Sequence, residues 1–191
     1  MARTPSVAAH EKVIAAALQL FGERGIEGTS MDAIAQSSGV SKATVYKHWK
    51  DKETLCIAVI VSLRTQPPEF RSGNTLRDLT DLLTHLSKSD HPDRVMKIWP
   101  RIMGYAIANP RFAAALQEHS FGPRRTQIAR ILGEAADRGD IPGDIDPQFA
   151  MDLLVGPLMH RRITTGQIPD GFAERVVASF LCSYGANHCK Q

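Results

Sequence analysis

The chain has 191 residues, of which 43% are hydrophobic, and its formal net charge is +3. This length allows one or two domains with a substantial core, and the hydrophobic content excludes a disordered chain. The small net charge excludes a histone-like protein that coats DNA by overall attraction, so any attraction to DNA must be local. No apolar run approaches a membrane span and no signal peptide is visible, so we expect a cytoplasmic protein.

The pattern of cysteine, histidine and serine residues does not indicate a catalytic or metal site. The cysteines at 56, 182 and 189 lack metal-ligand spacing, and the seven histidines include no His-x-x-x-His pair. No Gly-x-Ser-x-Gly elbow occurs, and Ser120 is only a sequence neighbour of His119. We therefore expect no metal, no cofactor and no enzymatic activity.

The first predicted helix spans about residues 8–23. Val13, Ala17, Leu20 and Phe21 recur there at helical spacing, which predicts one buried face. Three closely spaced glycines follow and end the helix.

Two short helices are predicted next, at about residues 31–38 and 42–48, on either side of Gly39. Thr29 or Ser30 can cap the first helix through a side-chain oxygen. A glycine just past a helix end can adopt the left-handed conformation that costs other residues more. Two helices joined closely in this way are typical of a helix-turn-helix motif.

The second of these helices carries the candidate chemistry. From Ser41 to Lys52 there are four lysines and one acid, a local charge of +3. Small and polar residues at its N-terminal end fit the major groove of DNA, and the flanking lysines and the tyrosine suit phosphates. A solvated charged face on an ordinary helical hairpin has the same pattern. The candidate DNA-binding residues are Thr29, Ser30, Ser41, Lys42, Ala43, Thr44, Tyr46, Lys47, His48 and Lys52.

These candidates divide into two kinds by their position. Residues at the N-terminal end of the reading helix are expected to meet base edges, and those at its far end or at neighbouring helix starts are expected to hold phosphates. The expected base contacts come from Lys42, Ala43 and Thr44. The expected phosphate contacts come from Thr29, Tyr46, His48 and Lys52.

A fourth helix, about residues 52–65, is predicted after Asp51, a plausible N-cap. Its apolar residues surround most of the helix, which predicts a buried connector. Pro67 and Pro68 cannot continue it. We place the boundary there, with a DNA-binding domain at residues 1–52 and a second domain at 66–191.

The second domain is predicted to be helical as well, with no strand-like alternation, so the fold class is all-α with nine or ten helices. The further helices include residues 75–86, 92–107, 110–116, 128–135, 147–165 and 170–184. Pro100 predicts a kink, and Phe121-Gly122-Pro123 predicts a break. The adjacent Arg124 and Arg125 are interpreted as solvated surface.

Residues 12–63 resemble the N-terminal domain of TetR-family transcriptional regulators. The most specific match is GVSKATVYKHWKDKETL, residues 39–55, with its Tyr-x-His-aromatic-x-x-Lys end. The family usually has phenylalanine where Trp49 stands, and the change keeps a large aromatic. Residues 141–172 resemble more loosely the C-terminal domain of one branch of the family, and residues 66–125 offer almost no motif.

The resemblance implies a dimeric, ligand-responsive regulator, usually a repressor that leaves a palindromic operator when a small apolar or amphipathic effector binds. The candidate pocket residues are Met96, Trp99, Met103, Tyr105, Phe112, Phe121 and Met159. Two apolar stripes could pack against a second copy in a four-helix arrangement. They contain Ile128, Ile131, Leu132 and Ala135, and Leu153, Leu154, Leu158 and Met159.

Two alternatives remain open from the sequence. A partner protein rather than a small molecule could control the DNA-binding regulator. The chain could also be a helical binding module that keeps a helix-turn-helix for packing only and does not bind DNA.

Overall fold

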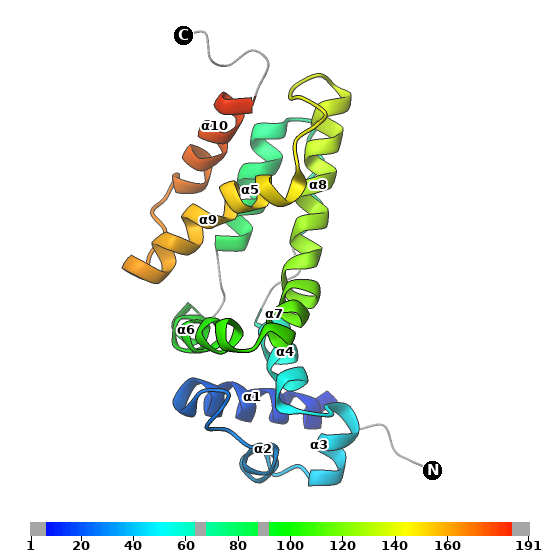
Figure 1. Cartoon of the computed structure of the whole chain (residues 1–191), viewed down its shortest axis with the longest axis vertical. Coiled ribbons are helices and arrows are strands. Elements are labelled where there is room, and N and C mark those ends of the chain that lie inside the picture. The colour runs from blue at the N-terminus through cyan, green and yellow to red at the C-terminus, as the bar shows by residue number, and fades with distance from the viewer. Residues whose placement is uncertain (1–6, 64–67, 88–91, 185–191) are drawn as a thin grey trace. The chain divides into compact units, whose positions relative to one another are not determined.

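A computed structural model describes residues 7–63, 68–87 and 92–184, and only the backbone of residues 92–97. These residues form ten α-helices and one π-helical turn, with no β-strand among them (Figure 1), so the predicted all-α class is confirmed. The chain divides into two compact units, one made of residues 1–65 with 90–120 and the other of residues 66–89 with 121–191.

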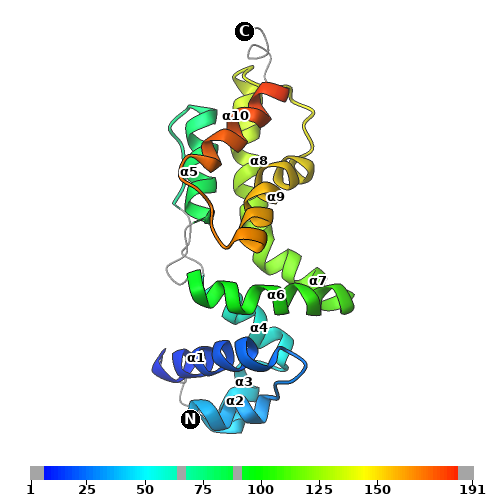
Figure 2. The same cartoon turned by 90° about the vertical axis from the view of Figure 1, so that its left-hand side faces the viewer.

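The first unit is built around its N-terminal helix. Its helices are α1 (Val7–Arg24), α2 (Met31–Ser38), α3 (Lys42–His48), α4 (Lys52–Ser62), α6 (Pro92–Ala108) and α7 (Pro110–Leu116). In Figures 1 and 2, α1 lies between α2 and α6, and it also packs on α4. The predicted inner face of α1 is confirmed, because Val13, Ala17, Leu20 and Phe21 are all buried.

The second unit is a four-helix cluster. Its helices are α5 (Thr75–Ser87), α8 (Gly122–Asp137), α9 (Pro147–Thr165) and α10 (Phe172–Tyr184). Each of α5 and α9 packs on the other three helices. Their apolar faces meet in one core that includes Leu79, Leu82, Ile128, Leu154 and Val177.

The compact units differ from the two predicted domains in the placement of α6 and α7. We predicted one domain for residues 66–191, whereas α6 packs on α1 and α7 packs on α4. The hydroxyl of Tyr105 on α6 donates a hydrogen bond of 2.7 Å to Oε1 of Glu53 on α4. An apolar stripe shows that a helix face is buried without identifying its partner, so this grouping is not visible in the sequence.

The predicted break at Phe121-Gly122-Pro123 is wrong. A π-helical turn, Gln117–Phe121, stands there, and α8 begins directly after it at Gly122. Pro123 occupies the first turn of α8. Backbone N–H groups in the first turn make no hydrogen bond within the helix, so a proline there costs none.

The predicted interface stripe on α8 is also wrong. Ile128, Ile131, Leu132 and Ala135 are buried in the core of the second unit within a single chain. They face α5 and α9 of their own chain, so they cannot reach a second copy. On α9, Leu154 and Leu158 are buried in the same core and the same correction applies to them, whereas Leu153 is 38% exposed.

Among the helices that the structure describes, none combines the length and the apolar character needed to cross a bilayer.

Candidate DNA-binding site

The α2–α3 pair forms as its capping residues predict. The Oγ of Ser30 accepts a hydrogen bond of 3.1 Å from the N–H of Ala33, and the Oγ of Ser41 accepts one of 3.3 Å from the N–H of Thr44. Gly39 ends α2 with φ of 67°, the left-handed conformation that favours glycine. These contacts fix the turn that presents α3, so the helix-turn-helix is confirmed.

The inner side of this pair is held by apolar contacts. Ile34 on α2 and Val45 on α3 are fully buried. Trp49, directly after α3, is only 5% exposed, and its ring centroid lies 4.9 Å from that of His10 on α1. The end of the reading helix is therefore anchored on α1 by one large aromatic side chain.

The outer side of α3 is polar and exposed. Lys42, Ala43, Tyr46, Lys47 and His48 are exposed, and α3 itself carries no acidic residue. Ser41 at its start is also exposed, and Thr44 is half-buried with its hydroxyl 2.8 Å from that of Ser41. A short helix that presents small and polar groups at its N-terminal end and cations beyond them matches what the major groove admits.

Lys42 has an acidic partner on the neighbouring helix. Its Nζ lies 2.6 Å from Oδ2 of Asp32, and this hydrogen bond raises the pKa of Lys42. Both side chains are exposed, so the pair can open at little cost. A base contact by Lys42 therefore requires exchange of Asp32 for DNA, whereas Ala43 needs no such exchange.

Lys52 begins α4 beside the helix-turn-helix. Its Nζ donates a hydrogen bond of 3.3 Å to the carbonyl of Glu27, which places the ammonium beside the loop that precedes α2. Asp51 caps the first turn of α4. Burial favours a higher pKa for Asp51, but the hydrogen bonds from Thr54 and Glu53 and the charge of Lys50 together outweigh it, and the net shift is downward. Because the Asp51 carboxylate already accepts from the first turn, the candidate phosphate contact at this position is the Lys52 ammonium itself.

The prediction that the Thr29 side chain contacts phosphate is wrong. Thr29 is 3% exposed, and its hydroxyl donates inward to the carbonyls of Gly25 at 2.7 Å and Leu20 at 3.3 Å. It ties the end of α1 to the start of α2. Ser30, the next residue, is exposed and remains a DNA-binding candidate.

The candidate pocket residues are distributed over both units. Trp99, Met103, Tyr105 and Phe112 belong to the first unit, where the Tyr105 and Phe112 rings meet edge to face with centroids 5.1 Å apart. Phe121 and Met159 pack against the core of the second unit. Met96 lies within α6, but its side chain is outside the described part of the structure. The prediction of a shared pocket stays a prediction.

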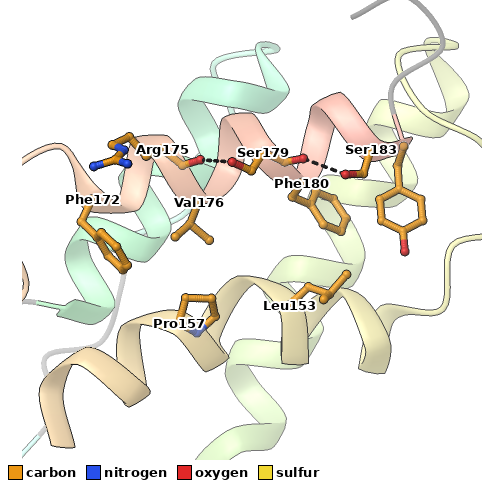
Figure 3. Close-up of a pocket in the computed structure, with 9 residues that line it drawn as sticks. Leu153, Pro157, Phe172, Arg175, Val176, Ser179, Phe180 and Ser183 are labelled. Atoms are coloured by element: carbon orange, nitrogen blue, oxygen red, sulfur yellow. Dashed lines mark hydrogen bonds between the residues drawn. The ribbon is translucent and has the colours of Figure 1, made fainter. Parts of the chain in front are cut away.

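An apolar groove runs along the second unit between α9 and α10 (Figure 3). Leu153 and Pro157 of α9 face Phe172, Val176 and Phe180 of α10 across it. Of these, only Leu153 was singled out from the sequence for a surface role. The groove requires two helices to lie side by side, which a one-dimensional pattern does not specify.

The exposed side of α9 adds to this apolar surface. Phe149, Leu153 and Ile163 are the exposed large hydrophobics of this helix, with Gly156 and His160 exposed between them. These five positions are separated by four, three, four and three residues, which places them on one face of the helix.

Family models match both parts of the chain. Residues 13–59 match the model for bacterial regulatory proteins of the tetR family, and residues 71–180 match the tetracyclin repressor-like C-terminal domain. The second match alone covers more than half of the chain.

Individual relatives agree with the family models. The chain is 27% identical over 172 residues to the HTH-type transcriptional regulator YdeS of Bacillus subtilis, covering 88% of this chain and 85% of YdeS. It is 25% identical over 171 residues to the DNA-binding transcriptional repressor TetR of Mycobacteroides abscessus, which covers 88% of this chain and 90% of that relative.

Solved structures have the same fold. A TetR-family regulator from Mesorhizobium loti superimposes with a TM-score of 0.67 at 28% identity, covering 96% of this chain and all of that one. The flavonoid-responsive regulator FrrA superimposes with a TM-score of 0.69 at 25% identity, covering 95% of this chain and 100% of FrrA.

The motif geometry and these matches agree. Regulators of this family bind DNA operators, act as dimers and respond to ligands through the C-terminal domain. The chain belongs to the TetR family of transcriptional regulators.

Proposed function

We propose that this chain acts as a homodimer that represses transcription from a palindromic operator and is released by a small apolar or amphipathic effector. The observation that carries the proposal is the α3 surface, exposed and free of acids on a fully capped and anchored helix. One such helix per chain reads too few base pairs for tight specific binding, so two copies on a two-fold operator are needed.

The second copy is proposed to pack on α9 and α10. Apolar residues that form a continuous exposed surface are typical of protein–protein contacts. The face of α9 with Phe149, Leu153 and Ile163 adjoins the groove toward α10. Gly156, in the middle of this face, is exposed with open space in front of it, which permits close approach of another helix. A two-fold axis would bring the same surface of both chains together.

Release by a small molecule is supported by the names that two relatives carry. The solved structure FrrA is described as flavonoid-responsive, and the Mycobacteroides abscessus relative is named a repressor. The mechanism proposed is a population shift. The two reading helices must stand about one DNA turn apart, roughly 34 Å, and a ligand that prefers another spacing lowers operator affinity.

Substitutions on and beside α3 test the DNA contacts. Lys52→Ala is expected to weaken binding to specific and non-specific DNA alike. It is also expected to reduce the slope of log affinity against log salt concentration by about one, because one phosphate contact is lost. Thr44→Ala is expected to cost about 1–3 kcal/mol at one operator position and to relax the preference there. Fluorescence anisotropy at several salt concentrations, with an operator obtained by mapping bound genomic DNA, measures both effects.

The control is Arg77→Ala, which removes an exposed cation from α5 in the second unit. Its salt dependence is expected to equal that of wild type. A Lys52→Ala protein with altered sequence preference and an unchanged salt dependence would show that the phosphate role is wrongly assigned.

A further inference from the structure

One acidic side chain stands beside the reading helix. Asp32 lies in the first turn of α2, and its Oδ2 is 2.6 Å from Nζ of Lys42, the first residue of α3. The two residues are ten positions apart in the chain, so their contact joins the two helices of the motif. The carboxylate therefore lies within the length of one lysine side chain from the start of α3.

An acid at this place is close to DNA whenever α3 enters the major groove. The side chains of Asp32 and Lys42 are 54% and 64% exposed. Together with Ser30, Gln36 and Ser41 they line an open hollow between α2 and α3. The phosphates of DNA repel a carboxylate, so Asp32 weakens binding unless the DNA offers it a partner.

The place of Asp32 in α2 has one purely local explanation. An acid in the first turn of a helix interacts favourably with the free N–H groups there. That role concerns the stability of α2 and makes no use of Lys42. It predicts no effect of Asp32 on which bases are bound, so base preference distinguishes it from a role in recognition.

Lys42 is the only charged residue among the three candidates for base contacts. Ala43 offers a methyl group, and the hydroxyl of Thr44 lies 2.8 Å from that of Ser41. An ammonium group only donates hydrogen bonds, and guanine presents N7 and O6 as acceptors in the major groove. Because Asp32 already accepts from this ammonium, DNA must compete with the carboxylate for it.

Exchange of both partners requires a base pair with acceptors and a donor. A carboxylate only accepts hydrogen bonds, and the amino group of cytosine is a donor that it can use in the major groove. A G·C pair presents the guanine acceptors and this cytosine donor side by side. An A·T pair presents the adenine amino group where guanine has O6, which opposes an ammonium. A phosphate offers a new partner to Lys42 alone.

We propose that Asp32 is a specificity-determining residue that holds Lys42 away from phosphates and releases it at a G·C pair, where Lys42 donates to guanine and Asp32 accepts from cytosine. This inference rests on the proposed function, because it takes α3 as the helix that enters the major groove. Non-specific binding then lacks the cation of Lys42, and the operator gains two contacts that other sequences do not supply.

Binding to random-sequence DNA tests whether Asp32 withholds Lys42 from phosphates. Asp32→Ala frees Lys42, so the slope of log affinity against log salt concentration is expected to steepen by about one per chain. Lys42→Gln is expected to keep the slope of wild type, because the paired Lys42 contacts no phosphate. Glu23→Ala removes an exposed acid from α1 as the control and is expected to keep that slope as well.

Operators changed one base pair at a time test the reading of a G·C pair. Wild type is expected to prefer G·C at one position of each half-site by at least about tenfold. Lys42→Gln and Asp32→Ala are each expected to lose most of this preference at the same position. The double variant is expected to lose no more, because the two side chains act as one unit. Glu23→Ala is expected to keep the preference.

The same measurements can overturn the proposal. An Asp32→Ala protein with the base preference of wild type at every position would restrict Asp32 to the stability of α2. Losses at different positions in Asp32→Ala and Lys42→Gln would show that the two residues do not read one base pair. An unchanged salt slope in Asp32→Ala would show that Asp32 does not withhold Lys42 from phosphates. Both side chains are exposed, so all variants are expected to fold.

The behaviour of wild type separates this inference from the proposed function. Equal affinity of wild type for operator and for random-sequence DNA refutes both. Discrimination by wild type that Asp32→Ala retains in full leaves the repressor function standing and refutes only the role of Asp32.

Discussion

Leu153→Glu is expected to yield a folded monomer that binds its operator at least about a hundredfold more weakly than wild type. Leu153 is exposed in the single chain, so the change does not disturb the core. It would place one carboxylate from each chain in the proposed apolar interface, where an unpaired charge is costly. A monomer then contacts only one half-site of the operator. Specific binding is typically about 10³–10⁷ times tighter than non-specific binding, and most of this ratio is lost.

The matched control for this substitution is Leu76→Glu. Leu76 is 39% exposed on α5 and Leu153 is 38% exposed on α9, so the two changes introduce the same charge at equal exposure. Light scattering gives the mass and anisotropy gives the operator affinity. A Leu153→Glu protein that stays dimeric would show that α9 is not part of the dimer interface.

Trp49→Ala is expected to destabilise the first unit by about 3–5 kcal/mol and to abolish operator binding. Trp49 is nearly fully buried, follows α3 directly and packs against His10 of α1. Its loss leaves a cavity beneath the end of the reading helix, so α3 is no longer held in one orientation.

Trp49→Phe serves as the control, because it keeps an aromatic ring at the same place. It is expected to retain operator binding within about tenfold, with less than half of the stability loss. Denaturant unfolding measures the free energies. A stability change below about 1 kcal/mol for Trp49→Ala would show that this ring does not anchor α3.

Local capping chemistry explains why the helix-turn-helix could be predicted closely from the sequence. Ser30, Gly39 and Ser41 each satisfy backbone groups within three residues, so their roles follow from the adjacent chain. The bounds of α2 and α3 agree with the prediction to the residue. Thr29 was misassigned because its hydroxyl bonds to carbonyls up to nine residues away, on α1.

The second unit was harder to predict because its contacts are distant in sequence. The stripe Ile128–Ala135 correctly indicated a buried face, but whether its own chain or a second copy covers that face depends on where α5 and α9 pack. Arg124 was interpreted as solvated surface, whereas the structure places it half-buried beside the exposed Arg125, for a related reason. A charged residue beside another arginine predicts solvent exposure unless the helix that covers it is known.

The measurement that tests the central claim most directly is calorimetry of ligand binding with and without operator DNA. The ligand would be one found by thermal-shift screening of small apolar and amphipathic molecules against the wild-type protein. Because coupling between two binding sites is reciprocal, operator DNA is expected to weaken ligand binding by the same factor by which the ligand weakens DNA binding, roughly 5–150-fold. Equal ligand affinity with and without operator would contradict the account, leaving a DNA-binding protein that its ligand does not regulate.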